Sequence, residues 1–256
     1  MKVEVKIGQE HRYADLNHPI DISLTTAQNE SPLAWYVDPL SVSPVMTERF
    51  TGSVQQGGDV NFRNLSFNPH GNCTHTECVG HIAKEVYSVN NLLEKHHFIA
   101  QVITVIPNQL DSDNSMFEKK GDFIMDVHHF NGLINSNIEA LIIRTLPNPS
   151  NKKSKNYNST NWPYLKAQAA KYIREQGVKH LLIDQPSVDR EEDGGQLLSH
   201  RAFWNYDNEI DLTRTITELI YVPENVKDGI YLLNLSVSNI ENDACPSRPV
   251  LFSLNK

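Results

Sequence analysis

Short runs of apolar and β-branched residues, separated by turn residues, dominate the first part of the chain. Runs of this length and composition are typical of β-strands. The longest of them ends at Pro107, which cannot donate a backbone hydrogen bond and therefore closes a strand. The pattern predicts a mainly β first half, with strands over 3–7, 20–24, 60–67 and 98–106.

A strand, a helix and a second strand follow one another in the middle of the chain. The run 140–145 is continuously apolar apart from its last two residues, which is typical of a buried strand. Apolar residues recur at helical spacing over 163–176, and Gly177 occupies the position of a helix C-cap. The run 181–184 then predicts the second strand.

The tail of the chain returns to β structure over 230–237 and 249–252. Together these elements predict the α/β class: one domain over residues 1–256, with a mixed β-sheet and flanking helices. The segment 151–161 is polar and shows no periodicity, so we expect it to be an insertion on the surface.

Composition and charge narrow the range of partners. The chain has 256 residues, 39% of them hydrophobic, which is enough for a core without disulfide or metal staples. Its net charge of −8 argues against nucleic acid or an anionic membrane as the main partner. No apolar run approaches the ~20 residues of a spanning helix, and the first residues do not resemble a signal peptide. We therefore expect a cytoplasmic protein that acts on a small-molecule substrate or binds another protein.

A cluster of histidines between positions 70 and 81 is the clearest sign of chemistry. His75 and Glu77 are two residues apart, so on an extended segment both side chains point to the same side. His81 lies one helical turn beyond Glu77 if a helix begins near Cys78. Imidazole and carboxylate groups suit zinc, manganese or iron, and an ion with an open coordination position lowers the pKa of bound water to about 7. The cluster predicts hydrolysis.

Two other interpretations of the cluster stay open at this point. The histidines could be loop residues whose nitrogens are satisfied by hydrogen bonds. Cys73 and Cys78 could instead ligate a structural zinc ion, although neither has a second cysteine at zinc-ribbon spacing. With Cys245 they form an odd set, which suits reduced thiols in the cytoplasm.

The segment from His70 to His81 resembles the motif H-x-G-T-H-x-D-x-P-x-H of the cyclase family of metal-dependent hydrolases, which includes bacterial-type kynurenine formamidases. The resemblance extends over nearly the whole chain, because several other segments have counterparts in the same order. These segments are D-I-S at 21–23, L-I-I-R-T at 141–145, the stretch 177–189, His200, Glu218 and 243–250. The resemblance implies an α/β fold of the swivelling β/β/α type and a homodimer.

The resemblance also implies a site that holds two divalent ions. One ion would be bound by His70, His75 and Glu77, and Glu77 would bridge to the second. His200 and Glu218 would complete the second position. His81 would serve as the general acid/base, and Trp35 would lie over the substrate.

This chain departs from the family motif at three points. It has one extra residue between His70 and His75, so we expect His70 to reach the site through a bulge. Glu77 replaces the aspartate of the motif and is one methylene longer. Glu209 rivals Glu218 as the carboxylate of the second position, and the apolar residues around Glu218 favour the latter.

These observations predict hydrolysis of an amide, or of a related ester or cyclic amide, in the manner of a kynurenine formamidase. A ring-opening hydrolase of the isatin type would use the same ligands. A metal- or ligand-binding protein that has lost activity is the alternative outside the enzymes. Asp184, Ser187 and Asp189 lack the surroundings of a serine nucleophile, and we expect them to support the site rather than to react.

Overall fold

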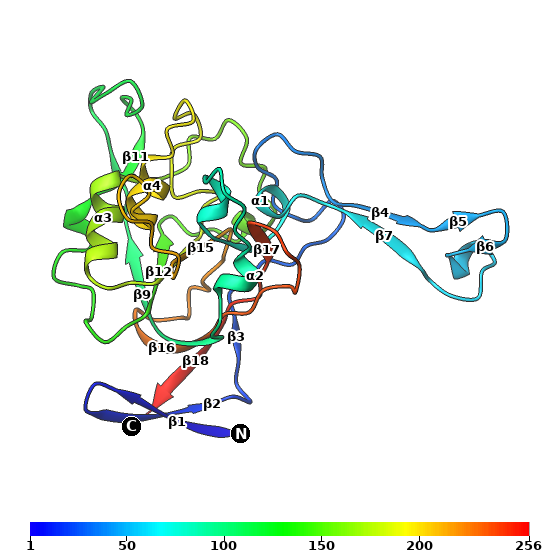
Figure 1. Cartoon of the computed structure of the whole chain (residues 1–256), viewed down its shortest axis with the longest axis horizontal. Helices are drawn as coiled ribbons and strands as arrows, with labels where there is room; N and C mark the ends of the chain where they lie inside the picture. Colours follow the sequence, from blue (N-terminus) through cyan, green and yellow to red (C-terminus); the bar gives the residue numbers. More distant parts are fainter. Residues whose placement is uncertain (256) are drawn as a thin grey trace.

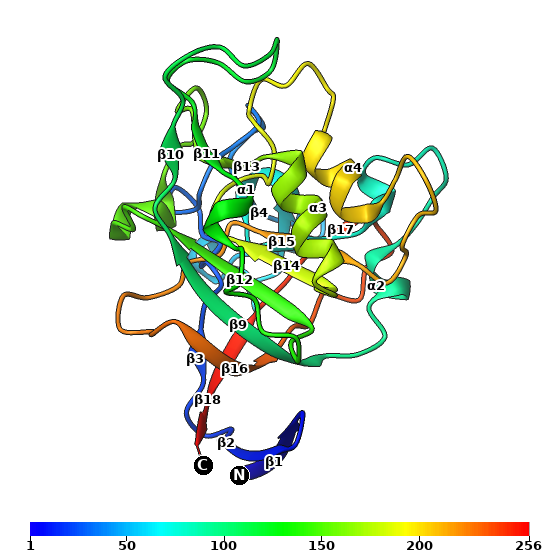
Figure 2. The same ribbon diagram turned by 90° about the vertical axis from the view of Figure 1, so that its left-hand side faces the viewer.

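A mixed β-sheet of eleven strands forms the centre of the computed structural model, which describes residues 1–255 (Figures 1 and 2). Ten strands follow one another across the sheet, and β3 (Ile20–Asp21) pairs with β18 beside them. In spatial order the ten are β1 (Lys2–Ile7), β2 (Glu10–Asp15), β18 (Val250–Asn255), β16 (Gly229–Asn234), β9 (His97–Val105), β12 (Ala140–Thr145), β14 (His180–Ile183), β15 (Thr215–Glu218), β8 (His75–Glu77) and β17 (Ala244–Pro246).

The middle of the sheet is parallel and its flanks are antiparallel. Strands β9, β12, β14 and β15 run in the same direction, whereas β16 and β8 pair antiparallel to them. Every residue of β12 and β14 is buried, as expected of parallel strands that are covered on both faces. This confirms the predicted α/β domain with a mixed sheet, while the swivelling β/β/α type stays a prediction.

Helices cover one face of the parallel strands. α3 (Ala167–Glu175) turns Ala169, Ala170 and Ile173 into the core and packs against α4 (Leu198–Trp204), as Figure 2 shows. The short helices are α1 (Pro69–Asn72) and α2 (Val89–Leu92), with 3₁₀ turns η1 (Val54–Gln56), η2 (Val79–His81), η3 (Val127–His129) and η4 (Ser150–Ser154). Among residues 1–255, no helix has both the length and the apolar character needed to cross a membrane.

The helix expected over 163–176 begins later than predicted. Residues 164 and 165 form β13 (Tyr164–Leu165), which pairs with β11 (Phe123–Met125), and β11 pairs in turn with β10 (Asn108–Gln109). Tertiary pairing therefore overrides the helical spacing at these two positions. The helix ends before Gly177, as predicted, and this glycine adopts a φ of 88°.

The polar segment 151–161 does not lie wholly on the surface. Lys152 is buried, and its Nζ donates to Asp184 Oδ2 at 2.9 Å and to the Thr145 carbonyl oxygen at 2.9 Å. Tyr157 is also buried. The prediction of a surface insertion is wrong for these two residues, because a long-range ion pair and aromatic packing hold them inside.

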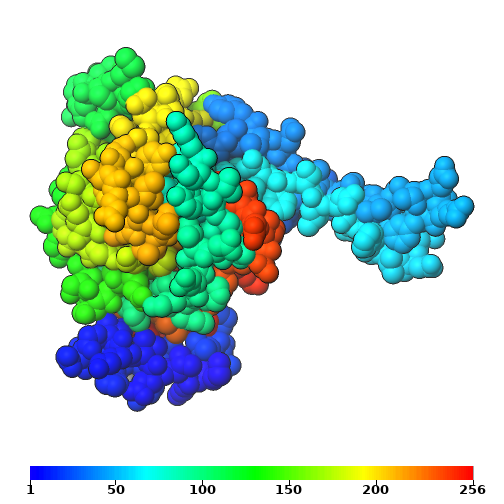
Figure 3. All heavy atoms as spheres, viewed as in Figure 1, coloured from blue at the N-terminus to red at the C-terminus, as the bar shows by residue number. Residues whose placement is uncertain are grey.

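A β-hairpin projects from the body of the molecule over residues 40–66 (Figures 1 and 3). It consists of β4 (Ser41–Pro44) paired with β7 (Arg63–Ser66), followed outward by β5 (Met46–Thr47) paired with β6 (Phe50–Thr51). We call this segment the arm. The predicted strand 60–67 is thus only partly correct, since β7 belongs to the arm rather than to the central sheet.

Candidate metal centre

Strands β8 and β15 lie side by side and carry three of the predicted ligands. Glu218 pairs directly with His75, and all three residues of β8 are buried. Because side chains alternate along a strand, His75 and Glu77 point to the same side, as the sequence predicts. The end of β15 and the length of β8 therefore form the floor of the site.

The fully buried carboxylate of Glu77 lies at the centre of three imidazoles. Its Oε1 is 2.9 Å from His200 Nε2, and its Oε2 is 3.2 Å from His70 Nδ1. His81, which ends η2, places Nδ1 at 3.8 Å from the same Oε2. Two segments that flank Glu77 in the sequence, and one that lies 123 residues away, thus converge on its side chain.

His75 and Glu218 form the second side of the site. The two side chains approach to 3.4 Å between His75 Nε2 and Glu218 Oε2, and the other imidazole nitrogen of His75 lies 3.0 Å from the Cys73 carbonyl oxygen. Glu218 Oε1 accepts a hydrogen bond from the Val188 backbone N–H at 2.9 Å. These contacts fix the orientation of both side chains and turn the facing atoms toward each other.

Two buried polar atoms in the site lack a hydrogen-bond partner, namely His75 Nε2 and Glu77 Oε2. Buried polar groups are rarely left without one, so such atoms indicate a missing ligand. Two groups of side chains have ligand atoms within 4.8 Å of one another: His70, Glu77 and His81, and His75, Glu77 and Glu218. The donor set fits divalent ions, and Glu77 belongs to both groups.

A helical turn, not a bulge, brings His70 into the site. The extra residue of the motif lies in α1, whose first turn is capped by the Asn68 side chain accepting from the His70 backbone N–H at 2.9 Å. Gly71 packs so tightly that an added Cβ would lie 2.5 Å from a methyl group of Val37. The expected bulge is therefore wrong, and the short helix accommodates the extra residue.

Charge in the site favours cations. Burial raises the pKa of the Glu77 carboxyl. The charge of His81 and the hydrogen bond from His200 outweigh this effect and hold that pKa well below its usual value. Burial likewise opposes protonation of His70, yet the nearby carboxylates of Asp243 and Glu77 raise its pKa to about 10. A metal ion would compete with protons for such a nitrogen.

Two aspartates hold the imidazoles in place. Asp189 Oδ2 lies 2.6 Å from His200 Nδ1, which directs the other nitrogen of His200 toward Glu77. This position agrees with the supporting role expected of Asp189. Asp243 Oδ2 lies 3.1 Å from His70 Nε2 and 3.4 Å from His81 Nδ1. Asp243 lies in the segment 243–250, which resembles the cyclase family, but the sequence indicates no role for it. Nothing near Asp243 in the chain points to a histidine partner.

The structure distinguishes Glu218 from Glu209, the two carboxylates considered for the second metal position. Glu218 is buried beside His75 and His200, with His200 Nε2 at 3.7 Å from its Oε1, whereas Glu209 lies exposed in the loop after α4. Trp35 is partly buried and packs edge-on against Trp162, with ring centroids 5.2 Å apart. The backbone N–H of the preceding Ala34 donates to the Gly71 carbonyl oxygen, which keeps Trp35 close to α1.

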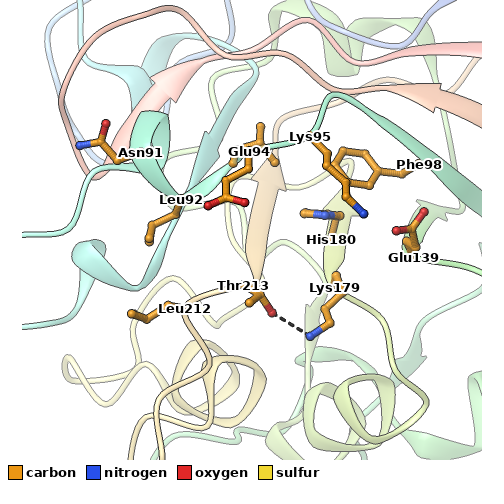
Figure 4. A pocket seen from close by; sticks show the side chains of 11 residues that line it. Asn91, Leu92, Glu94, Lys95, Phe98, Glu139, Lys179, His180, Leu212 and Thr213 are labelled. Atoms are coloured by element: carbon orange, nitrogen blue, oxygen red, sulfur yellow. Dashed lines mark hydrogen bonds between the residues drawn. The ribbon is translucent and has the colours of Figure 1, made fainter.

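A cavity of about 410 Å³ lies at the opposite end of the parallel strands (Figure 4). It is lined by His180, which begins β14, and by Lys179, whose Nζ donates to Thr213 Oγ1 at 2.7 Å. Glu218, in contrast, lies at the carboxyl end of β15, which runs parallel to β14. The cavity is therefore separate from the candidate metal centre.

Comparison with known proteins agrees with this arrangement. The model of the Cyclase family, described as "Putative cyclase", matches residues 14–190, which is most of the chain and includes His70, Glu77 and His81. The chain belongs to the Cyclase family.

Curated relatives of this Cyclase-family chain have low sequence identity but nearly full coverage. A kynurenine formamidase of Bacillus cereus is 23% identical over 93% of this chain and 96% of its own length. A kynurenine formamidase of Bacillus thuringiensis is 24% identical over the same shares of the two chains.

Solved structures share the fold of the chain. A protein of Bacillus stearothermophilus described as a "predicted metal-dependent hydrolase" superimposes with a TM-score of 0.63 at 12% identity, covering 92% of this chain and 98% of its own. Isatin hydrolase A of Labrenzia aggregata gives a TM-score of 0.63 at 11% identity, covering 92% of this chain and 93% of its own. At these identities the likeness concerns the fold alone.

Proposed function

We propose that this Cyclase-family chain is a metal-dependent hydrolase that cleaves an amide bond with two divalent ions, zinc or manganese. The observation that carries the proposal is the position of Glu77. Its buried carboxylate is shared by two groups of ligand atoms, and its Oε2 has no hydrogen-bond partner. A carboxylate in this position suits a bridge between two ions.

The ligands divide between the two positions. In this proposal His70, His75 and Glu77 would hold the first ion, and Glu77, His200 and Glu218 would hold the second. The ligand atoms that lie within 4.8 Å of one another are grouped differently, since His75 lies with Glu218 and His70 lies with His81. When bound, such ions polarise a carbonyl group and activate water. Asp189 keeps His200 in the orientation that presents Nε2 to the site.

His81 acts as the general acid/base. Its side chain is 29% exposed, against none for Glu77, so it can meet a substrate at the edge of the site. The carboxylate of Asp243 lies 3.4 Å from its Nδ1 and helps to fix the orientation of the imidazole. From this position His81 accepts a proton from the attacking water and donates one to the leaving nitrogen.

The curated relatives favour a formylated aromatic amine as the substrate. Kynurenine formamidases match the chain over almost its entire length. Trp35 supplies an aromatic surface near α1 for such a ring. Ring opening of an isatin-type cyclic amide is the second candidate, which the structural neighbours favour. We further propose a cytoplasmic location and a homodimer.

A comparison of two substrates tests the proposal. The full chain, loaded with zinc or manganese, is assayed for hydrolysis of formyl-aniline and of isatin. We expect a higher kcat/KM for formyl-aniline. The opposite order would assign the chain to the ring-opening enzymes. Bound metal without turnover of either compound would overturn the amide hydrolase and support a binding protein.

A further inference from the structure

The cavity at the amino ends of the parallel strands contains none of the residues assigned to the proposed reaction. Its volume of about 410 Å³ lies near the lower end of the roughly 300–1,000 Å³ that small-molecule sites occupy. Strands β12 and β14 begin at the cavity, where the Glu139 carbonyl oxygen accepts from the backbone N–H groups of Lys179 and His180. The segment 91–95 and residues 212 and 213 complete the lining. The size of the cavity suits one small molecule.

Part of the cavity wall is apolar and aromatic. The rings of Phe98 and His180 lie with their centroids 4.0 Å apart. Leu92 and Leu93 add aliphatic surface, and Leu212 is 38% exposed at the cavity. In Figure 4, Leu92 and Leu212 lie on one side of the pocket, and Phe98 and His180 lie on the other. A lining of this kind binds a ligand with an apolar body.

Side chains of both charges surround this apolar surface. Lys95 and Lys179 contribute ammonium groups, whereas Glu94 and Glu139 contribute carboxylates. Among residues 1–255, Lys179 Nζ lies 3.7 Å from Asp211 Oδ2, but Lys95, Glu94 and Glu139 form no ion pair. The glutamates would repel a simple anion, and the lysines would repel a simple cation. A ligand that carries both charges satisfies both sets of side chains.

A buried imidazole supplies a further polar group. His180 Nδ1 lies 2.8 Å from Thr215 Oγ1, and none of residues 1–255 provides a hydrogen-bond partner for Nε2. His180 lines the cavity and is 6% exposed, so this nitrogen is available to a bound molecule. Burial, assisted by the charge of Lys179, lowers the pKa of His180 to about 3. The imidazole is therefore neutral at physiological pH and can form a hydrogen bond without adding charge.

We propose that this cavity binds a free α-amino acid with an apolar or aromatic side chain. The carboxylate of the amino acid pairs with Lys95 and Lys179, and its ammonium group pairs with Glu94 and Glu139. The side chain of the amino acid packs against the apolar wall. In Figure 4 the ammonium group of Lys95 lies beside His180 and the carboxylate of Glu94 lies toward the leucines, so the two charges are presented at different places.

The cavity is separate from the candidate metal centre, and binding there does not depend on the proposed hydrolysis. Titration calorimetry of the full chain compares L-phenylalanine with N-acetyl-L-phenylalanine and L-phenylalaninamide. Each derivative lacks one of the two charges, so we expect L-phenylalanine to bind about tenfold more tightly than either. Glycine should also bind more weakly, because it has no side chain to pack against the apolar wall.

Charge reversal locates the bound amino acid. Lys95→Glu and Glu94→Lys should each raise the dissociation constant for L-phenylalanine about tenfold or more, since each places a like charge beside the ligand. Lys120→Glu and Glu224→Lys reverse exposed charges outside the cavity lining and are the matched controls. Both controls should bind like the unaltered chain. All four positions are exposed, so each variant should fold, and circular dichroism verifies this.

Several outcomes would overturn the proposal. Absence of L-phenylalanine binding at millimolar concentration would exclude the site. Equal affinity for the N-acetyl derivative would indicate a simple carboxylate ligand, and equal weakening in the control variants would indicate an effect of net charge. Weakening by His81→Ala but not by Lys95→Glu would place the amino acid in the metal centre instead of the cavity.

Discussion

Glu77 and His200 meet at 2.9 Å between Oε1 and Nε2, although 123 residues separate them in the chain. The other nitrogen of His200 lies 2.6 Å from Asp189 Oδ2, so the imidazole is held at both ends. This contact joins the histidine cluster of the first half to the helical part of the second half. The site therefore requires the complete fold.

Replacement of Glu77 should remove metal and activity together. Both groups of ligand atoms share this carboxylate, so Glu77→Ala leaves neither complete. Elemental analysis of the dialysed variant measures the metal that remains bound. Glu209→Ala, at an exposed position outside the site, is the control and should retain both properties. Metal content close to that of the unaltered chain in Glu77→Ala would refute the bridging role.

Replacement of His81 should separate metal binding from turnover. A side chain that transfers protons can be removed without emptying the site, so His81→Ala should keep its metal and lose roughly 10²–10⁴-fold in kcat. Metal content and steady-state kinetics on the same preparation check this. Loss of metal would instead make His81 a ligand, in line with its place in one of the two ligand groups.

Lys152→Met should lower the free energy of unfolding by about 3 kcal/mol, since it leaves the buried Asp184 carboxylate without its cation. Denaturant unfolding measures the loss. Lys120→Met, at an exposed position, should change stability by no more than about 0.5 kcal/mol. Equal effects of the two substitutions would mean that the buried ion pair does not contribute.

His180 should make the fold less stable in acid. Burial, assisted by the charges of Lys179 and Arg214, lowers its pKa to about 3. Between about pH 6.5 and pH 3 the unfolded chain therefore binds a proton that the folded chain excludes. The free energy of unfolding should fall with decreasing pH over this window, by at most about 1.4 kcal/mol per pH unit from this residue.

A variant isolates the contribution of His180. His180→Gln should show a smaller difference in unfolding free energy between pH 7 and pH 5 than the unaltered chain. His18→Gln, in an exposed turn, should leave that difference unchanged. An equal pH dependence in His180→Gln and the unaltered chain would rule out His180 as the titrating group.

The local pattern of apolar residues along the chain was sufficient to predict the centre of the fold. The apolar run 140–145 and the helical spacing before Gly177 are strong signals, and β12 matches the first while α3 follows the second from Ala167 onward. Lys152 and Tyr157 lie in a segment without periodicity, and their burial depends on partners such as Asp184 that are remote in sequence. A local pattern cannot reveal such partners.

The candidate site was predictable from the sequence only where the spacing of residues along a strand fixes the direction of their side chains. His75 and Glu77 are two positions apart on a strand, with Thr76 between them, and this spacing alone places both on one face. The helical turn that carries His70 was not predictable, because α1 depends on the Asn68 cap and on the close packing of Gly71. Asp243 was missed as a partner of His81, since their contact spans 162 residues and arises only when β17 pairs with β8.

Removal and return of metal tests the central claim most directly. Hydrolysis of formyl-aniline is measured on the full chain as prepared, after chelation, and after addition of zinc or manganese, with bound metal determined at each stage. The account predicts that turnover disappears with the metal and returns as about two ions bind per chain. Turnover that persists in the metal-free chain, or that stays absent with two ions bound, would contradict it.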